Sequence, residues 1–259
     1  MLRPRITPCL LVQNGGLVKT VQFKNPRYVG DPINAVKIFN EKEADELIVL
    51  DIEATARNVE PNFRLISQFA VECRMPLCYG GGIKTPEQAK RIISLGVEKI
   101  AISSAAIDNP AVITAIAQEI GSQSVVVVID AKESRWTSGY EVRTRNGTRK
   151  TGTSVVDAAR DAESRGAGEV VINSIDRDGM MSGYDVALAT EVRKATLLPM
   201  TILGGAGSLA DMANLIEACG VIGAAAGSFF VFKGPLRGVL ISYPNSAQKD
   251  ELTRAAARA

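Results

Sequence analysis

Two stretches of sequence decide the fold, "MPLCYGGGIKT" at 75–85 and "LPMTILGGAGS" at 198–208. Each runs from a proline through a short apolar segment into paired glycines. A second pair of segments, "ADELIVLDIEA" at 44–54 and "AGEVVINSIDR" at 167–177, is separated by the same 123 positions. Both pairs of segments have the same offset of 123 positions, which is close to half of the 259 residues. This shared offset indicates that the chain consists of two similar halves.

Short β-rich runs alternate with segments of helical period along the whole chain. Strands are expected near 5–11, 46–51, 76–79, 98–102, 124–130, 169–173, 199–203 and 221–226. Helices are expected near 32–43, 60–73, 85–95, 109–120, 153–165, 185–196, 208–218 and 235–241. Eight such units predict an α/β fold, a closed (β/α)8 TIM barrel, rather than an open doubly wound sheet. No G-x-G-x-x-G follows the first strand, which weakens a dinucleotide-binding alternative.

The expected organisation is one barrel over 1–244, with half-barrels of about 1–122 and 123–244 and a C-terminal tail at 245–259. One insertion, about 133–152, interrupts the alternation of strands and helices between the fifth strand and its helix. Its Asn146-Gly147 pair, flanked by alternating residues, predicts a β-hairpin over the top of the barrel. For Trp136 and Tyr140 on this hairpin we expect packing across strands, and the alternative is that they cover a ligand or a partner.

Composition excludes several classes of protein. A formal net charge of +2 without a Lys/Arg run does not favour a nucleic-acid partner. We expect a cytoplasmic protein with no membrane partner, since no apolar run approaches a membrane span and the first residues lack a signal peptide. Four scattered cysteines and no histidine predict no metal site, and no histidine-activated serine or cysteine nucleophile. No cofactor is expected.

Glycine-rich turns predict phosphate binding. "YGGGIKT" at 79–85 and "LGGAGS" at 203–208 each end a strand and open a helix. Each is followed one strand later by a run of small residues, "ISSAA" at 102–106 and "AAAGS" at 224–228. Glycines let the backbone approach an anion closely. Two such sites on opposite sides of the barrel mouth would hold a small molecule with a phosphate at each end.

The chain resembles the cyclase subunit family of imidazole glycerol phosphate synthase, a histidine-biosynthesis barrel. The resemblance extends to about Pro244 and rests on "GDPINAVKIFNEKEADELIVLDI", "YGGGIKTPEQAKRIISLGVEKIAISSAA", "GSQSVVVVIDAK", "GAGEVVINSIDRDGMMSGYD" and "GGAG". It implies that ammonia, released by a glutaminase docked under the barrel, crosses to the top face. There it closes an imidazole ring on a bisphosphate substrate and splits that substrate.

The resemblance also implies roles for single residues. Asp130 matches a general acid/base, and its setting behind "VVVVI" would raise its pKa. Asp178 matches an active-site carboxylate, and Lys19 lies in a segment, 13–30, that resembles a mobile loop over the site. One phosphate site is expected from Gly82, Ser103 and Ser104, and the other from Gly205, Gly227 and Ser228. An ammonia gate is expected from Arg5, Glu46, Lys99 and Glu169, for which a structural salt-bridge cluster is the alternative.

Three positions depart from the family. A second catalytic aspartate is expected where this chain has Leu11, an asparagine where it has Ser103, and a serine where it has Leu203. We therefore expect an ammonia-conducting subunit whose independent cyclase activity is doubtful. Its "PCLL" start and "FFVFKGPLRGVLISYP" ending resemble a divergent branch that pairs with an amidotransferase to build amidino groups on surface-polysaccharide sugars. The alternatives are a genuine cyclase, with Asp130 and Asp178 covering the lost role, and a phosphate-binding barrel with neither activity.

Overall fold

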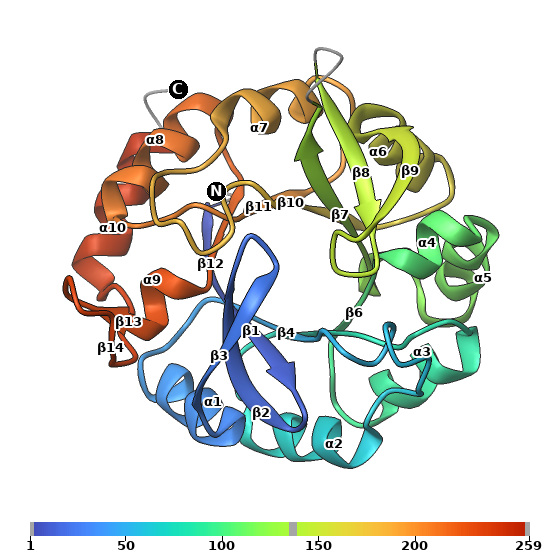
Figure 1. Cartoon of the computed structure of the whole chain (residues 1–259), viewed down its shortest axis with the longest axis horizontal. Coiled ribbons are helices and arrows are strands. Elements are labelled where there is room, and N and C mark those ends of the chain that lie inside the picture. The colour runs from blue at the N-terminus through green and yellow to red at the C-terminus, as the bar shows by residue number, and fades with distance from the viewer. Residues whose placement is uncertain (1–2, 135–138, 257–259) are drawn as a thin grey trace.

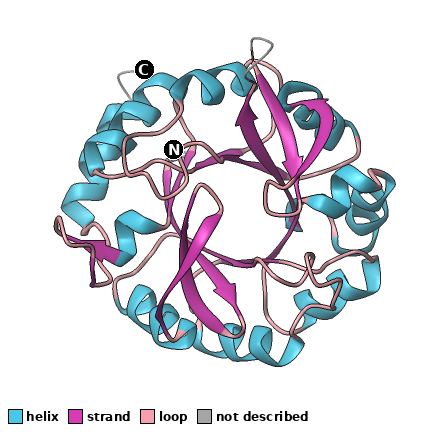
Figure 2. Cartoon of the chain, viewed as in Figure 1, coloured by secondary structure: helices cyan, strands magenta, loops and turns pink. Residues whose placement is uncertain are grey.

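The computed structural model describes residues 3–134 and 139–256. Within this part, eight parallel strands form a closed barrel surrounded by helices (Figures 1 and 2). These strands are β1 (Arg5–Gln13), β4 (Leu47–Asp51), β5 (Leu77–Gly80), β6 (Lys99–Ile102), β7 (Val125–Glu133), β10 (Glu169–Ser174), β11 (Met200–Leu203) and β12 (Gly223–Ala226). Each pairs with the next in this order, and β12 returns to β1. The expected TIM barrel is confirmed.

The helices pack outside the strands. They are α1 (Pro32–Glu41), α2 (Phe63–Glu72), α3 (Pro86–Ser94), α4 (Ser104–Asp108), α5 (Ala111–Ile120), η1 (Ser122–Ser124), α6 (Val155–Ser164), α7 (Val186–Arg193), α8 (Leu209–Cys219), α9 (Ser228–Val231) and α10 (Ser246–Ala256). Several ends follow local chemistry. The Thr85 hydroxyl caps α3 by accepting a hydrogen bond from the Gln88 amide at 3.3 Å, and Gly121 ends α5 with a φ of 86°.

The expected helix at 235–241 is wrong. In its place lies a small hairpin of β13 (Phe232–Lys233) and β14 (Gly238–Val239). Gly234 has a φ of 71° and Arg237 a φ of 48°, so the backbone between these strands has left-handed residues, which break a helix. The outer layer is completed instead by α10, which packs against α8 and buries Leu252.

The repeat is visible in atomic contacts. A Cβ on Gly81, whose φ is 119°, would lie 2.4 Å from the carbonyl oxygen of Asp51. A Cβ on Gly204, whose φ is 95°, would lie 2.6 Å from the carbonyl oxygen of Ser174. Both residues of the second contact are 123 positions after those of the first. The two glycine turns therefore fold back on the preceding strand in the same way, and neither tolerates a side chain.

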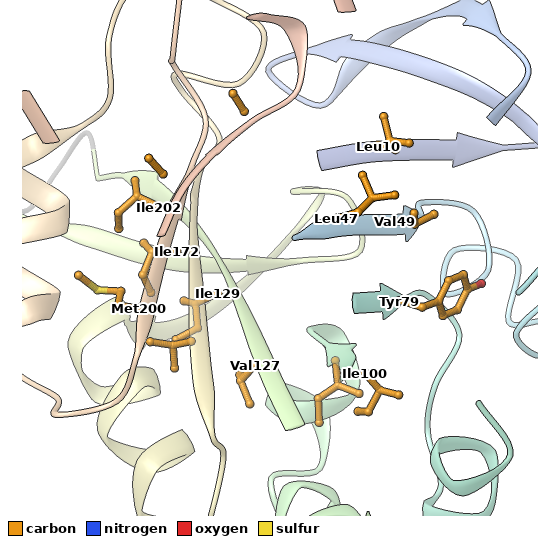
Figure 3. Packing of buried hydrophobic residues seen from close by; sticks show 14 of the residues in the cluster. Leu10, Leu47, Val49, Tyr79, Ile100, Val127, Ile129, Ile172, Met200 and Ile202 are labelled. Carbon is orange, nitrogen blue, oxygen red and sulfur yellow. The ribbon is translucent and has the colours of Figure 1, made fainter. Parts of the chain in front are cut away.

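Two apolar layers hold the barrel. The larger one lies between strands and helices and includes Val127, Ile129 and Ile172 (Figure 3). The smaller layer is formed by the side chains at the alternate strand positions, which face the interior of the barrel. It consists of Cys9, Ile48, Cys78, Ala101, Val126, Val128, Val171, Leu203 and Ala225. Many of its members are small, so the core of the barrel is filled by short side chains.

Two antiparallel hairpins extend from the top of the barrel and lean over its mouth (Figure 1). The first is formed by β2 (Gly16–Val21) and β3 (Lys24–Gly30), so the segment expected to be a loop over the site is a β-hairpin. The second is formed by β8 (Tyr140–Thr144) and β9 (Arg149–Ser154), with Asn146-Gly147 in its turn. Trp136 lies outside the described residues, and the Tyr140 hydroxyl donates to Asp185 Oδ1 at 2.9 Å.

Candidate functional site

The carboxyl ends of the barrel strands bring the candidate residues together at one mouth. Asp130 lies near the end of β7, and two polar side chains from neighbouring strands donate to it. Asn173 Nδ2 donates to Asp130 Oδ1 at 3.1 Å, and Ser103 Oγ donates to Asp130 Oδ2 at 3.3 Å. Burial raises the pKa of Asp130 to about 7, although both hydrogen bonds act in the opposite direction. A carboxyl group with such a pKa can both give and take a proton near neutral pH.

Asn173 is a site residue that sequence reasoning missed. It lies on β10 directly opposite Asp130 on β7, and its Oδ1 has no hydrogen-bond partner among the described residues. The sequence did contain a signal for this residue. Asn173 directly follows the apolar residues "VVI" of its strand, just as Asp130 directly follows "VVVVI". Ser103, which was expected to bind phosphate, contacts a carboxylate in this structure, and its phosphate binding stays a prediction.

The mouth contains two cavities. The first has a volume of about 130 Å³ and is lined by Gly82, Ser103, Ser104 and Asp130, among others. The second, of about 30 Å³, is lined by Lys19, Asp178, Gly205, Gly227 and Ser228, among others. The residues expected at two phosphate sites thus form two groups, one in each cavity.

Leu11, Phe23 and Asn173 line both cavities and lie where they meet. Leu11 stands where the family resemblance places a second catalytic aspartate. Its side chain also packs against the inner apolar layer of the barrel. The boundary between the cavities is therefore formed by two apolar side chains and the amide of Asn173, while the carboxylate of Asp130 lines only the first cavity.

Lys19 reaches from β2 into the second cavity. Its ammonium donates to the carbonyl oxygen of Cys9 at 2.6 Å, and the residue is only 5% exposed. Burial lowers the pKa of Lys19, against the opposing effect of neighbouring groups such as Asp178. A Cβ on Gly227 would lie 2.5 Å from Lys19 Nζ, so a side chain at this position would displace the lysine ammonium from where it lies here.

Asp178 fastens the first hairpin. Its Oδ2 accepts hydrogen bonds from Thr20 Oγ1 at 2.7 Å and from the Phe23 amide at 3.1 Å, and its carbonyl oxygen accepts one from the Gln22 amide at 2.9 Å. Phe23 then reaches the second hairpin, where a Cβ on Gly147 would lie 3.3 Å from the Phe23 ring. The turns of the two hairpins therefore meet above the site. In this conformation Asp178 positions the roof of the site.

The opposite end of the barrel holds the expected charged ring. Arg5 contacts Glu46 at 3.0 Å and Glu169 at 2.6 Å, while Lys99 contacts Glu46 at 2.6 Å and Glu169 at 2.9 Å. Thr201 Oγ1 also donates to Glu169 Oε1 at 2.7 Å. Burial alone would lower the pKa of Lys99, but the two carboxylates outweigh it and raise that pKa. The four charges satisfy one another in a closed ring.

Between the ring and the mouth, the barrel interior is mostly apolar but not uniformly so. Thr7 follows Arg5 by two positions on β1 and therefore faces the same interior. It is completely buried, and its hydroxyl has no hydrogen-bond partner among the described residues. Cys9 lies two positions further along β1, and Cys78 on β5 pairs with Lys99 of the ring. Burial raises the pKa of both thiols. These thiols are therefore poor nucleophiles.

Comparison with known proteins agrees with this architecture. A family model described as histidine biosynthesis protein matches residues 5–236. The chain belongs to this family. A protein of Leptospira borgpetersenii, provisionally named an imidazole glycerol phosphate synthase subunit HisF, is 57% identical over 252 residues, which cover 97% of this chain and 99% of that protein.

Two further relatives are less similar to this chain than the Leptospira protein is. A Pseudomonas aeruginosa protein provisionally named subunit hisF2 is 52% identical, with coverage of 96% of this chain and 99% of that protein. The imidazole glycerol phosphate synthase subunit HisF of Lactococcus lactis subsp. lactis is 40% identical, with 84% of each chain covered. The expected resemblance to this synthase, and with it the assignment to a cyclase-type enzyme subunit family, is confirmed.

Two further observations concern the whole chain. None of the described helices is long and apolar enough to cross a membrane. Within the same residues, no three acidic or cysteine side chains are grouped in a way that could hold a metal ion.

Proposed function

We propose that this chain is the synthase-type subunit of a glutamine amidotransferase system, which receives ammonia from a glutaminase docked at the amino-terminal face of the barrel. The charged ring lies at that face, and the interior above it carries the Thr7 hydroxyl, which has no hydrogen-bond partner in the described part of the chain. The relatives' names support a subunit that works with another protein. Since the ring is closed in this structure, one charged side chain has to move before ammonia can enter.

Arg5 is the ring member best placed to move. Its side chain is 31% exposed, against 18% for Lys99, 5% for Glu46 and 7% for Glu169. A docked partner that offers an acceptor to Arg5 would compensate the contacts that Arg5 loses, while Lys99 keeps both carboxylates paired. The ring would then open without leaving an unpaired buried charge.

A phosphorylated small molecule is the proposed ligand of the mouth, with one phosphate in each cavity. We further propose the divergent role, in which the ammonia serves amidino-sugar synthesis for lipopolysaccharide in the cytoplasm, together with a third enzyme of the amidotransferase or synthetase type. The divergent role is supported by two observations together. Leu11 places an apolar side chain at the boundary of the cavities, while all four charged residues of the ring are present. The higher identity to the relative with a numbered name, hisF2, than to the Lactococcus subunit agrees with this role.

The alternative is a genuine imidazole glycerol phosphate synthase cyclase of histidine biosynthesis. Asp130 alone offers one proton donor or acceptor next to the boundary, whereas Asp178 is occupied with the hairpin. A missing general acid or base costs roughly 10²–10⁴-fold in rate. We therefore expect this chain to turn over the bisphosphate substrate much more slowly than a cyclase with both carboxylates.

The test is imidazole formation by the purified chain with an ammonium salt and the bisphosphate substrate of the family. The wild-type chain is expected to be nearly inactive, and Leu11→Asp is expected to gain at least tenfold. Leu11→Asn, of similar size but without an ionisable group, is the matched control and should gain nothing. Wild-type turnover at the rate of ordinary enzymes would overturn the divergent role and favour the alternative. If a glutaminase encoded with this chain neither binds it nor stimulates it, both the divergent role and the cyclase alternative are overturned.

A further inference from the structure

Among the described residues that line the first cavity, none supplies a buried positive charge. Of the described residues that line it, Asp51 and Asp130 are acidic and Arg145 is the single basic one. Burial raises the pKa of Asp51, as it does for Asp130. A phosphate that entered between these two acids without a cation would meet like charges, or acids that must stay protonated. The second cavity has no such difficulty, because Lys19 lies within it.

Arg145 lies in the turn of the second hairpin, directly beside one wall of the first cavity. Its amide donates to Ser104 Oγ at 3.1 Å. A serine hydroxyl that accepts one hydrogen bond still has its own proton to donate. The main chain of Arg145 thus orients Ser104 so that the hydroxyl proton is free for a ligand oxygen in the cavity.

The guanidinium group of Arg145 is only loosely held. Its nearest carboxylate oxygen, Asp108 Oδ2, is 3.8 Å away, which is too long for a hydrogen bond. Asp108 is already paired with Arg149, whose Nη1 donates to Asp108 Oδ1 at 2.7 Å. Arg145 makes no side-chain hydrogen bond to any described residue, and its side chain is 56% exposed. It can therefore turn toward the cavity without leaving Asp108 unpaired.

We propose that Arg145 is a phosphate-binding residue of the first cavity, and that its guanidinium binds a phosphomonoester seated beside Gly82 and Ser104. This deepens the proposed function and rests on it, because it assumes that the first cavity holds a phosphate. A guanidinium presents paired N–H donors that match two phosphate oxygens, whereas a lysine offers only a point charge. Each cavity then has one cation, and each cation comes from a different hairpin.

A purely structural role makes a different prediction. If Arg145 only ties the hairpin to α4 through Asp108, Arg149 shares that role and has the shorter contact, at 2.7 Å against 3.8 Å. Arg149→Gln would then disturb the cavity at least as much as Arg145→Gln. Arg149 does not line the first cavity, so under our proposal its replacement leaves phosphate binding unchanged. The two arginines of one hairpin are thus a matched pair.

The experiment is a titration of the ¹⁵N-labelled full chain with inorganic phosphate at constant ionic strength. The amide signals of Gly82 and Ser104 report the first cavity, and those of Gly205 and Gly227 report the second. We expect Arg145→Gln to weaken binding at Gly82 about tenfold, which is the size of one charge-assisted contact at a half-exposed site. Binding at Gly205 should be unchanged, Arg149→Gln should behave as wild type, and Arg145→Lys should recover part of the loss.

The outcomes separate the two proposals. If the wild type titrates at neither Gly82 nor Gly205, the phosphate sites of the proposed function fail, and the role of Arg145 fails with them. If the wild type titrates at Gly82 and Arg145→Gln binds as tightly as Arg149→Gln, the role of Arg145 is overturned while the phosphate site stands. Equal weakening by both variants would show that the hairpin acts as a structural unit, which also overturns the proposal.

Discussion

The charged ring at the bottom of the barrel gives the sharpest test of the structure through Glu169→Gln. This change removes one of two carboxylates while keeping the size of the side chain. Glu169 is 7% exposed and contacts Arg5 at 2.6 Å, Lys99 at 2.9 Å and the hydroxyl of Thr201 at 2.7 Å. Its loss leaves two cations sharing Glu46. Breaking a buried ion pair from one side costs about 3–5 kcal/mol, because the remaining charge stays buried.

For a barrel of this size, that loss corresponds to a fall of roughly 6–20 °C in the midpoint of thermal unfolding. The matched control is Glu119→Gln, which removes a carboxylate that also lies 2.6 Å from a lysine, Lys90, but at the surface. The control should change the midpoint by no more than about 1–2 °C. Adding Lys99→Met to Glu169→Gln should cost less than the sum of the two single changes, since it leaves Arg5 and Glu46 as a neutral pair.

The effect of Glu169→Gln also depends on pH. Burial would raise the pKa of Glu169, but Arg5 and Lys99 outweigh it and lower that pKa below its ordinary value. A carboxylate with a lowered pKa stabilises the fold above its unfolded pKa of about 4.3 and loses this contribution as the pH falls through its folded pKa. The difference between wild type and variant should therefore be full at pH 7 and shrink below about pH 4. Equal midpoints of wild type and Glu169→Gln at pH 7 would refute the ring as a stabilising unit.

Two further changes test single contacts. Thr7→Val removes a buried hydroxyl that has no hydrogen-bond partner among residues 3–134 and 139–256, so it should stabilise the protein by about 1–2 kcal/mol in denaturant unfolding. A loss of stability would show that the hydroxyl is satisfied in solution. Asp178→Ala removes the acceptor of Thr20 Oγ1 and of the Phe23 amide, so hydrogen exchange at Phe23 should accelerate by at least about tenfold while amides of β8 stay protected. Unchanged exchange at Phe23 would mean that Asp178 does not fasten the hairpin.

Much of the site was predictable because it lies at strand ends. Parallel strands with a period of two place their last inward residues around one mouth, so the glycine turns could be placed there from the order of the elements. The role of Asp130 came from the family resemblance, and its position at the end of an apolar strand agrees with that mouth. The four charged residues of the ring were expected from the family resemblance, and they lie at the starts of the same strands. Asn173 could have been found by the same reasoning, since it occupies on β10 the place that Asp130 occupies on β7.

The sequence by itself determined the eight barrel strands, the two similar halves and the glycines that the turns at residues 81 and 204 require, because these depend on local period and backbone geometry. Tertiary structure alone decided which residues meet above the barrel. The Thr20 contact with Asp178 spans 158 positions and the Arg145 contact with Ser104 spans 41, and no local pattern encodes either. Only the structure also shows that α10, rather than the expected last helix, packs against α8. The division of the mouth at Leu11 also arises only when distant segments pack together.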